Sequence, residues 1–248
     1  MQKICIIIPC YNEEKRLPVK KYEDFYEYNS ISLCFVNDGS TDNTLEILKK
    51  LQAGKEDRFF IIDFEENLGK AEAIRLASLE LSDKKQFDKI GFFDADLSTP
   101  LNEILLLDKY LNSDPEYVLA FGSRILRLGS TIKRNSYRHY SGRIFSTLAS
   151  LILHLPVYDT QCGAKIIKAD LINVIFEEKF LSHWWFDIEI FARLIKFYGL
   201  EQVKNKLIEV PLNTWIEMGD SKISFFSMIK IPIDLLRIKM KYKINAKR

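Results

Sequence analysis

The sequence predicts an α/β fold in which helices cover both faces of a central, mostly parallel mixed sheet. Short apolar runs alternate with segments of helical length through the first half of the chain, an alternation typical of strand–helix–strand units. Polar clusters follow three of the predicted strands, as "PCYNEE", "NDGSTD" and "DADLST". Ligands of such sheets bind outside the carboxyl ends of the strands, so the three clusters indicate a single functional edge.

The predicted elements follow from hydrophobic runs and turn residues taken in order along the chain. Strands are expected at residues 4–8, 32–36, 59–63, 89–93 and 117–121, and helices at 17–28, 44–51, 70–81 and 101–111. Asp42 is expected to cap the second of these helices, because aspartate is a favoured N-cap residue. Further along, the expected elements are a strand at 164–167, helices at 170–176 and 186–197, and a strand at 203–211.

The composition indicates one globular domain followed by a short tail. The chain has 248 residues, of which 47% are apolar and 28% charged, and both values are near globular averages. No repeat or Gly/Ser/Pro-rich linker interrupts the chain, so residues 1–222 are predicted to form one domain and residues 223–248 a basic amphipathic tail. The sequence shows neither a signal peptide nor an apolar run of 18 residues, so a cytoplasmic chain that does not cross the membrane is expected.

Charge is distributed unevenly between the two halves of the chain. Residues 1–121 carry 15 Lys and Arg against 23 Asp and Glu, whereas residues 122–248 carry 21 against 11. The 42 residues from 117 to 158 contain no acidic side chain. A basic half favours an anionic partner, either a phosphate-bearing ligand or a lipid surface. Uneven surface charge without a function is the alternative.

Two carboxylates, those of Asp94 and Asp96, follow the apolar run at 90–93. In an extended chain they would lie on the same face, and about 4 Å apart they would repel by roughly 4 kcal/mol at an effective dielectric constant near 20. A divalent cation would cancel this repulsion. The alternative is helix capping, since Ser98 or Thr99 precedes a proline suited to a first helical turn, but that leaves both aspartates unexplained.

Read together, seven motifs resemble those of a known family. They occur in the order "IIIPCYNEEKRL", "VNDGSTDNT", "NLGKAEAIR", "FFDADLSTP", "FGSR", "DTQCGAKIIK" and "WFDIE". The chain resembles family 2 glycosyltransferases, especially polyprenyl-phosphate glycosyltransferases of the dolichyl-phosphate glucosyltransferase type. The resemblance covers residue 4 to about residue 222. It implies a GT-A fold, the Rossmann-like fold of nucleotide-diphospho-sugar transferases, and a metal-dependent transfer of a hexose.

The resemblance also implies roles for individual residues on the donor side. The nucleotide sugar would be bound by Pro9, Tyr11, Asn12, Glu13, Asp38, Lys70, Asp94, Ala95 and Gln161. The first four would cradle the nucleoside, Asp38 would contact the base or ribose, and Lys70 would lie beside the phosphates. Asp94 and Asp96 would bind the diphosphate through Mg²⁺ or Mn²⁺, with Asp96 preferred as the direct ligand. Asp96 and Asp159 are the expected catalytic residues, with Asp159 at the edge of the sugar pocket. A packed aromatic at Tyr11 and a solvated helix start at Lys70 are the alternatives.

On the acceptor side, four residues are expected to bind a phosphate: Arg124, Arg134, Arg138 and Ser141. Guanidinium groups bind phosphate oxygens in a bidentate manner, and the spacing of Arg134 and Arg138 would give them one face on a helix. A solvated basic face is the alternative. A phosphate monoester has its second pKa near 6 and is already an anionic nucleophile at neutral pH, so this chemistry needs no general base. For Asp187 the sequence leaves two roles open: it could face the site or cap a helix.

The tail mixes apolar and basic residues, which predicts contact with an anionic lipid surface. The uncharged run at 144–158 would share this lipid-facing side, and a tail packed on the core is the alternative. The sequence therefore predicts an inverting, metal-dependent hexosyltransferase, with glucose as the first guess. The acceptor would be a polyprenyl phosphate at the cytoplasmic face of the membrane, where the chain is peripheral, and no nucleic acid is expected as a partner.

Three other functions remain open from the sequence. The same donor chemistry could serve a saccharide hydroxyl acceptor in the synthesis of cell-surface polysaccharide. A protein that binds a nucleotide sugar without catalysis, or a sugar nucleotidyltransferase on a similar fold, belongs to another class. A nucleotidyltransferase would usually carry a Gly- and Lys/Arg-rich loop after its first strand, and "PCYNEEKRL" lacks the glycines.

Overall fold

The computed structural model describes residues 2–134, 136–218 and 225–244, with only the backbone described at 136–141 and 225–232. The strands are β1 (Ile4–Cys10), β2 (Ser32–Asp38), β3 (Phe59–Phe64), β4 (Lys89–Phe92), β5 (Leu119–Ser123), β6 (Thr131–Lys133), β7 (Lys165–Lys168), β8 (Leu207–Pro211) and β9 (Thr214–Ile216). The helices are α1 (Val19–Tyr28), α2 (Thr44–Gln52), α3 (Lys70–Asp83), α4 (Glu103–Leu111), α5 (Ser136–Leu153), α6 (Ile172–Phe176), α7 (Phe186–Tyr198), α8 (Leu200–Val203) and α9 (Phe225–Tyr242), with a 3₁₀ turn at Ala169–Leu171.

Seven strands form a mixed sheet in the order β3-β2-β1-β4-β7-β5-β8. All neighbours are parallel except β7, which runs antiparallel to both β4 and β5. The predicted α/β class and mostly parallel mixed sheet are therefore confirmed. Because β7 runs the opposite way, its first residue, Lys165, pairs with Phe92 and Phe121 near the carboxyl ends of the neighbouring strands.

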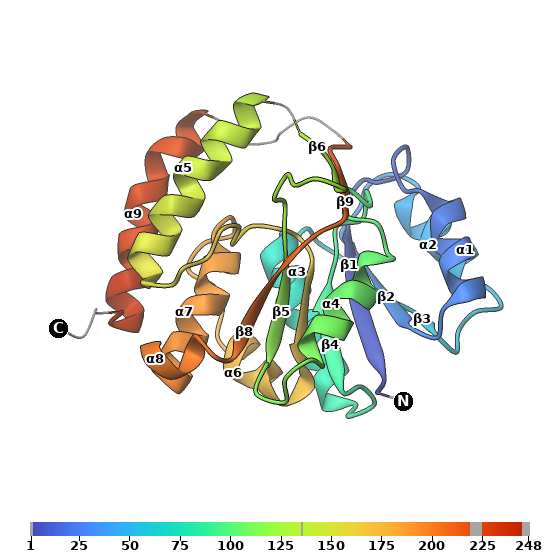
Figure 1. The fold of residues 1–248 in the computed structure, drawn as a ribbon. Helices are drawn as coiled ribbons and strands as arrows, with labels where there is room; N and C mark the ends of the chain where they lie inside the picture. The colour runs from blue at the N-terminus through green and yellow to red at the C-terminus, as the bar shows by residue number, and fades with distance from the viewer. Residues whose placement is uncertain (1, 135, 219–224, 245–248) are drawn as a thin grey trace.

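Helices cover both faces of the sheet, as Figure 1 shows. The helices α1, α2 and α4 pack on one face, while α3, α6 and α7 pack on the other. Alternation along the strands produces the two cores: in β1, Cys5 and Ile7 belong to one, and Ile6 and Ile8 to the other. In Figure 1, α5 and α9 lie side by side outside α7 and project beyond the sheet.

The structure corrects two expectations about local structure and adds a pair of strands that was not expected. β4 ends at Phe92, so Asp94 and Asp96 lie in a turn, in which the amide of Leu97 donates to the carbonyl of Asp94 at 3.2 Å. The expected strand at 203–211 begins only at Leu207, because α8 and a turn occupy the residues before it. The small parallel pair of β6 and β9 was not predicted, since three-residue strands carry too little pattern.

The tail forms a helix, α9, whose inner face joins the core. Leu235, Ile238 and Tyr242 are buried against the rest of the molecule. The predicted domain boundary at residue 222 lies among residues 219–224, outside the described part of the chain. None of the helices in the described ranges combines the length and apolar character that a bilayer crossing needs.

One fully buried lysine begins β4 at the amino end of the sheet, away from the functional edge. The ammonium of Lys89 donates to the carboxylate of Asp108 and, at 2.7 Å, to the amide oxygen of Asn112. A buried charge of this kind is tolerated only when it is paired and hydrogen-bonded. Lys89 therefore ties α4 to the sheet and has a structural role.

Candidate active site at the carboxyl edge of the sheet

The loop after β1 is held by the loop after β2. The side-chain oxygen of Asn12 accepts from the amide of Thr41 at 2.9 Å, and the amide of Glu13 donates to the hydroxyl of Thr44 at 2.8 Å. Asn12 has a φ of 53°, in the left-handed region that asparagine tolerates better than most residues. The ring of Tyr11 stays 37% exposed. This loop thus presents an aromatic side chain at the functional edge, and its contact with a nucleoside stays a prediction.

Asp38 connects the end of β2 to the start of α3. Its buried carboxylate accepts from the backbone amides of Leu68 and Gly69 at 2.8 and 3.0 Å. Burial raises the pKa of Asp38, while these two hydrogen bonds partly oppose the rise. Gly69 has a φ of 86°, which favours glycine. Asp38 therefore fixes the turn that delivers Lys70, and its contact with a base or ribose stays a prediction.

The carboxylate of Asp94 lies against a lysine and a glycine, and its side chain stays 33% exposed. The ammonium of Lys70 lies 2.5 Å from Oδ1 of Asp94. On the other side, a Cβ added to Gly163 would lie only 2.1 Å from Oδ2 of Asp94, so only glycine allows this approach. Burial raises the pKa of Asp94, but the charges of Lys70, Arg124 and Lys165 outweigh it and the net shift is downward. Asp94 is therefore held as a carboxylate.

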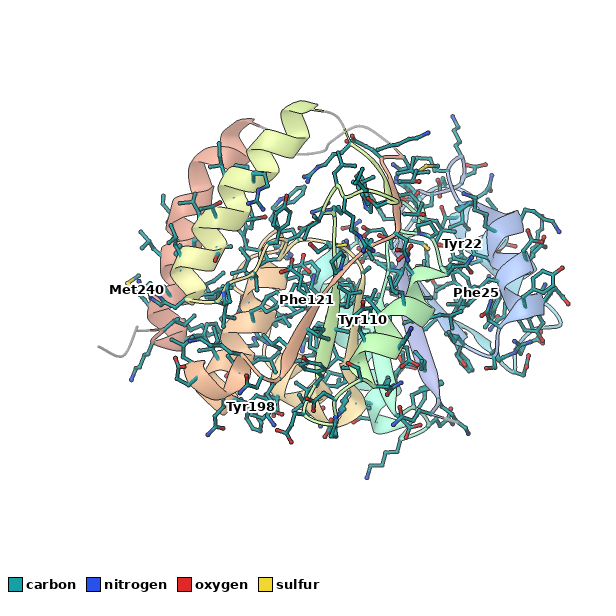
Figure 2. The ribbon with its side chains drawn as sticks, in the orientation of Figure 1. Tyr22, Phe25, Tyr110, Phe121, Tyr198 and Met240 are labelled. Carbon is teal, nitrogen blue, oxygen red and sulfur yellow. The ribbon has the colours of Figure 1, made fainter. Side chains whose placement is uncertain are left out.

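Asp96 and Ala95 are fixed by hydrogen bonds within and beneath the turn. Oδ1 of Asp96 accepts from the amide of Ser98 at 2.8 Å. The carbonyl of Ala95, between the two aspartates, accepts from the hydroxyl of Tyr22 at 2.9 Å. Tyr22 is fully buried and points from α1 toward the sheet (Figure 2). Sequence reasoning missed this tyrosine, because its partner is 73 residues away.

These two aspartates fit a divalent cation. Lys70 and the amide of Ser98 donate to Oδ1 of Asp94 and of Asp96 respectively, and within the described residues Oδ2 of each carboxylate accepts no hydrogen bond. No cluster of three or more metal-ligating side chains occurs within the described ranges. Mg²⁺ commonly binds through one or two carboxylates and completes its coordination with water and substrate phosphates. Such a cation would therefore need the donor's diphosphate as well as Asp94 and Asp96.

Arg124, directly after β5, forms a bidentate pair with Asp159. Its Nε and Nη2 donate to the two carboxylate oxygens at 2.6 and 2.8 Å, and its backbone amide also donates to Asp159 at 3.2 Å. Burial raises the pKa of Asp159, but the charge and hydrogen bonds of Arg124 dominate and hold the pKa at about 2. Asp159 thus remains ionised at neutral pH, with its oxygens directed at Arg124.

A second carboxylate holds the backbone beneath this pair. Oε2 and Oε1 of Glu209, in β8, accept from the amides of Tyr158 and Asp159, both at 2.8 Å. The amide of Gln161 donates to Asp159 at 3.3 Å, which folds the chain toward Gly163. Glu209 was not predicted as a site residue, because a single acidic residue in a strand has no motif. Its two bonds nevertheless fix Asp159.

The remaining acceptor residues are only partly described. Arg134 precedes α5, which begins at Ser136, so Arg134 and Arg138 do not share a helical face and that expectation was wrong. The guanidinium of Arg134 packs along α5 against Gly142, and its charge lowers the pKa of Asp159. The side chains of Arg138 and Ser141 lie outside the described part of the chain, and their roles stay predictions.

Asp187, which the sequence left open between facing the site and capping a helix, forms a buried ion pair with a lysine. It lies in the first turn of α7, and its Oδ1 accepts from the ammonium of Lys165 at 2.6 Å. Lys165 is fully buried at the start of β7. Sequence reasoning assigned this lysine no role, since lysines are rarely buried.

Comparisons with known proteins agree with the fold and motifs. Residues 5–176 match the family model described as glycosyl transferase family 2. A dolichyl-phosphate beta-glucosyltransferase of Trichomonas vaginalis is 30% identical over 98% of this chain and 74% of its own length. The human dolichyl-phosphate beta-glucosyltransferase is 29% identical over 100% of this chain and 78% of its own.

A solved structure supports the fold. The crystal structure of glucosyl-3-phosphoglycerate synthase from Mycobacterium tuberculosis, in complex with Mn²⁺, uridine-diphosphate-glucose and phosphoglyceric acid, has a TM-score of 0.69 at 16% identity. The alignment covers 99% of this chain and 81% of that chain. The predicted GT-A fold is therefore confirmed.

The Tyr22 hydroxyl gives a first test of the site. We expect Tyr22→Phe to weaken the binding of Mn²⁺ with uridine diphosphate roughly threefold to tenfold, because one hydrogen bond to the Ala95 carbonyl is worth about 1 kcal/mol. Titration calorimetry measures this. Tyr26→Phe, on the same helix, removes a 2.9 Å bond to Asp57 and should leave the affinity unchanged. Equal affinities for the two variants would contradict the role of Tyr22.

Proposed function

This chain belongs to glycosyl transferase family 2, and on that premise we propose that it transfers glucose from a nucleotide diphosphate sugar to a polyprenyl phosphate. The relatives named above act on dolichyl phosphate according to their names and match this chain almost from end to end. The observation that carries the proposal is the arginine at position 124, anchored by Asp159 beside the carboxylate of Asp94. It supplies a fixed positive charge next to the expected donor diphosphate.

The donor half would bind a uridine diphosphate sugar along the edge formed by β1, β2 and β4. Tyr11 would stack on the base. The ammonium of Lys70, which pairs with Asp94, would turn toward the diphosphate. Burial lowers the pKa of Lys70, yet Asp94, Asp187 and Asp96 raise it more, so the ammonium stays charged. Mg²⁺ or Mn²⁺ bound at Asp94 and Asp96 would neutralise the leaving diphosphate.

The acceptor phosphate would approach from the side of Arg124. Asp159 uses Nε and Nη2 of this guanidinium, and the two N–H groups of Nη1 point elsewhere and are suited to a phosphate oxygen. The acceptor oxygen would attack the anomeric carbon from the side opposite the diphosphate. The new C–O bond forms as the bond to the diphosphate breaks, and the nucleoside diphosphate leaves with the electron pair. The configuration at the anomeric carbon is inverted.

Proton removal is not required in this reaction. The acceptor phosphate is largely dianionic at neutral pH, whereas a hydroxyl acceptor would need a base. Asp159 would be a poor base, because its pKa of about 2 is far below neutrality and both oxygens are bound to Arg124. The site therefore suits a phosphate acceptor better than a saccharide hydroxyl. Catalysis would rest on positioning and charge.

Transfer of label from donor to lipid tests the proposal. Purified protein with Mg²⁺ or Mn²⁺ is incubated with labelled nucleotide sugars and a polyprenyl phosphate, and label is followed into the organic phase. We expect label from uridine-diphosphate-glucose in the lipid fraction, and loss of at least about a hundredfold in Asp96→Asn, which lacks a metal-binding carboxylate. Donor binding without a lipid product would reject the polyprenyl acceptor and favour a saccharide hydroxyl. Absence of donor binding would reject the transferase proposal.

The pH dependence of Asp159→Asn distinguishes an anchor from a base. The depressed pKa means that the pair with Arg124 is fully formed above about pH 4 and is lost only as the pH falls toward 2. We therefore expect Asp159→Asn to lower kcat/KM roughly tenfold or more across pH 5.5–8.5, with the shape of the profile unchanged. An ionisation present in the wild type and missing in the variant would instead identify Asp159 as the base.

We also propose that the paired helices α5 and α9 form the membrane-facing side, here called the α5/α9 face. Its exposed apolar residues are Ile144, Leu148 and Leu151 of α5 and Ile233, Leu236 and Met240 of α9. Their spacing of three and four residues puts each set on one side of its helix, and Met240 points outward in Figure 2. Basic residues of α9, such as Arg237 and Lys239, border them. Apolar side chains flanked by basic ones favour an anionic lipid surface.

Vesicle binding tests this face. We expect the triple variant Ile144→Ser, Leu151→Ser and Met240→Ser to bind anionic vesicles at least about tenfold more weakly, because each side chain loses its favourable transfer into lipid. Flotation with phosphatidylserine-containing vesicles measures this. The matched control is Leu105→Ser with Tyr110→Ser, which removes exposed apolar residues from α4. Equal loss in both variants, or none in the triple variant, would reject the α5/α9 face.

A further inference from the structure

The functional edge contains a buried lysine to which the reaction described above gives no role. Lys165 is fully buried at the first position of β7. Its ammonium donates to the carbonyl of Cys162 at 2.8 Å and to Oδ1 of Asp187 at 2.6 Å, and it lies 5.4 Å from the centre of the Phe92 ring. Removing such a charge from water is costly unless it is fully paired. An apolar side chain in this position would have packed without that cost.

The first partner of Lys165, the carbonyl of Cys162, lies next to the glycine that contacts Asp94. Cys162 immediately precedes Gly163, whose backbone touches the Asp94 side chain so closely that a Cβ would lie 2.1 Å from Oδ2. By holding the Cys162 carbonyl, the lysine fixes the turn that forms one wall around Asp94. The opposite wall is Lys70, 2.5 Å from Oδ1.

The second partner of Lys165, Asp187, is connected to Asp94 through Lys70. Asp187 lies in the first turn of α7, and Phe186, the first residue of that helix, packs against Phe92 with ring centres 5.8 Å apart. The negative charge of Asp187 acts on Lys70, the lysine that pairs with Asp94. Lys165 thus holds the turn at Cys162, which lies next to Asp94. It also holds Asp187, whose charge acts on Lys70, the partner of Asp94.

We propose that Lys165 is a positioning residue for donor binding, acting through the Cys162 carbonyl and the Asp187 carboxylate to keep Asp94 in its binding orientation. This inference rests on the proposed function in that the donor is taken to be a nucleoside diphosphate bound with a divalent cation at Asp94 and Asp96. It assigns Lys165 no contact with donor or acceptor. Lys165 instead sets the geometry of Asp94, which would contact the donor.

Loss of stability alone cannot test this role, because breaking any buried ion pair is destabilising. The chain supplies a matched control in Lys89, which is equally buried and is also bonded to an aspartate and to one further oxygen. Lys89 lies at the amino end of the same sheet, far from the functional edge. A purely structural role for Lys165 predicts the same behaviour for both lysines.

The experiment measures the Kd of uridine diphosphate with Mn²⁺ by titration calorimetry, without any acceptor, alongside thermal unfolding. We expect Lys165→Met to raise this Kd tenfold or more and Lys89→Met to change it less than twofold, while both lower the unfolding temperature. The double variants Lys165→Met/Asp187→Leu and Lys89→Met/Asp108→Leu remove both charges, and replacement of a buried pair by apolar residues commonly restores stability. We expect the first double variant to regain stability and to keep its raised Kd.

The inference is overturned if Lys165→Met, or its stable double variant, binds with the wild-type Kd. If neither variant folds, Asp187→Asn decides, since it keeps the side-chain size and removes only the charge, and an unchanged Kd would then overturn the inference. In turnover, the donor KM should rise while the KM for polyprenyl phosphate stays constant. A wild-type protein that binds no uridine diphosphate would reject the proposed donor instead, so the two failures are distinguishable.

Discussion

The contact between the Gly163 backbone and the Asp94 carboxylate is the constraint on which the rest of the site depends. It brings the segment after Asp159 against the turn after β4, although the two are far apart in sequence. Three positive charges act on this carboxylate: Lys70, which pairs with it, Lys165, and Arg124, which is paired with Asp159. Because Gly163 has no side chain, its backbone can approach the Asp94 carboxylate this closely. The local geometry around Asp94 therefore depends on glycine at position 163.

Much of the fold was predictable because it follows local patterns. The first five strands and the helices between them begin and end within a few residues of their expected bounds, since apolar runs and turn residues punctuate them clearly. The region from 122 to 164 showed no such pattern, and neither β6 nor α5 was predicted. The antiparallel direction of β7 also escapes sequence patterns, because a strand reads the same in either direction. Tertiary pairing decides it.

Sequence patterns indicated where the candidate site lies but not its detailed geometry. Polar motifs after β1, β2 and β4 were expected to meet, and the structure brings Tyr11, Asp38 and Asp94 to one edge. The pairing of the aspartates was argued from an extended chain, whereas a turn carries them. The supporting groups, Tyr22, Glu209 and Lys165, form hydrogen bonds with partners in other segments, namely Ala95, Asp159 and Asp187. No single stretch of sequence contains both partners of such a bond, so contacts of this kind appear only in three dimensions.

The reversed direction of β7 limits how this chain can change in length. Side chains alternate between the two faces of the sheet along the strand, with Ile166 on the α4 side and Ile167 on the other. Inserting or deleting one residue between Gly163 and Lys165 would shift this register and turn the lysine toward α4, away from Asp187. The same change in the exposed loop near Gly129, where an added Cβ would meet nothing, disturbs no register. Variation in length among proteins of this type should accumulate in that loop, while the short approach to β7 keeps a constant residue count.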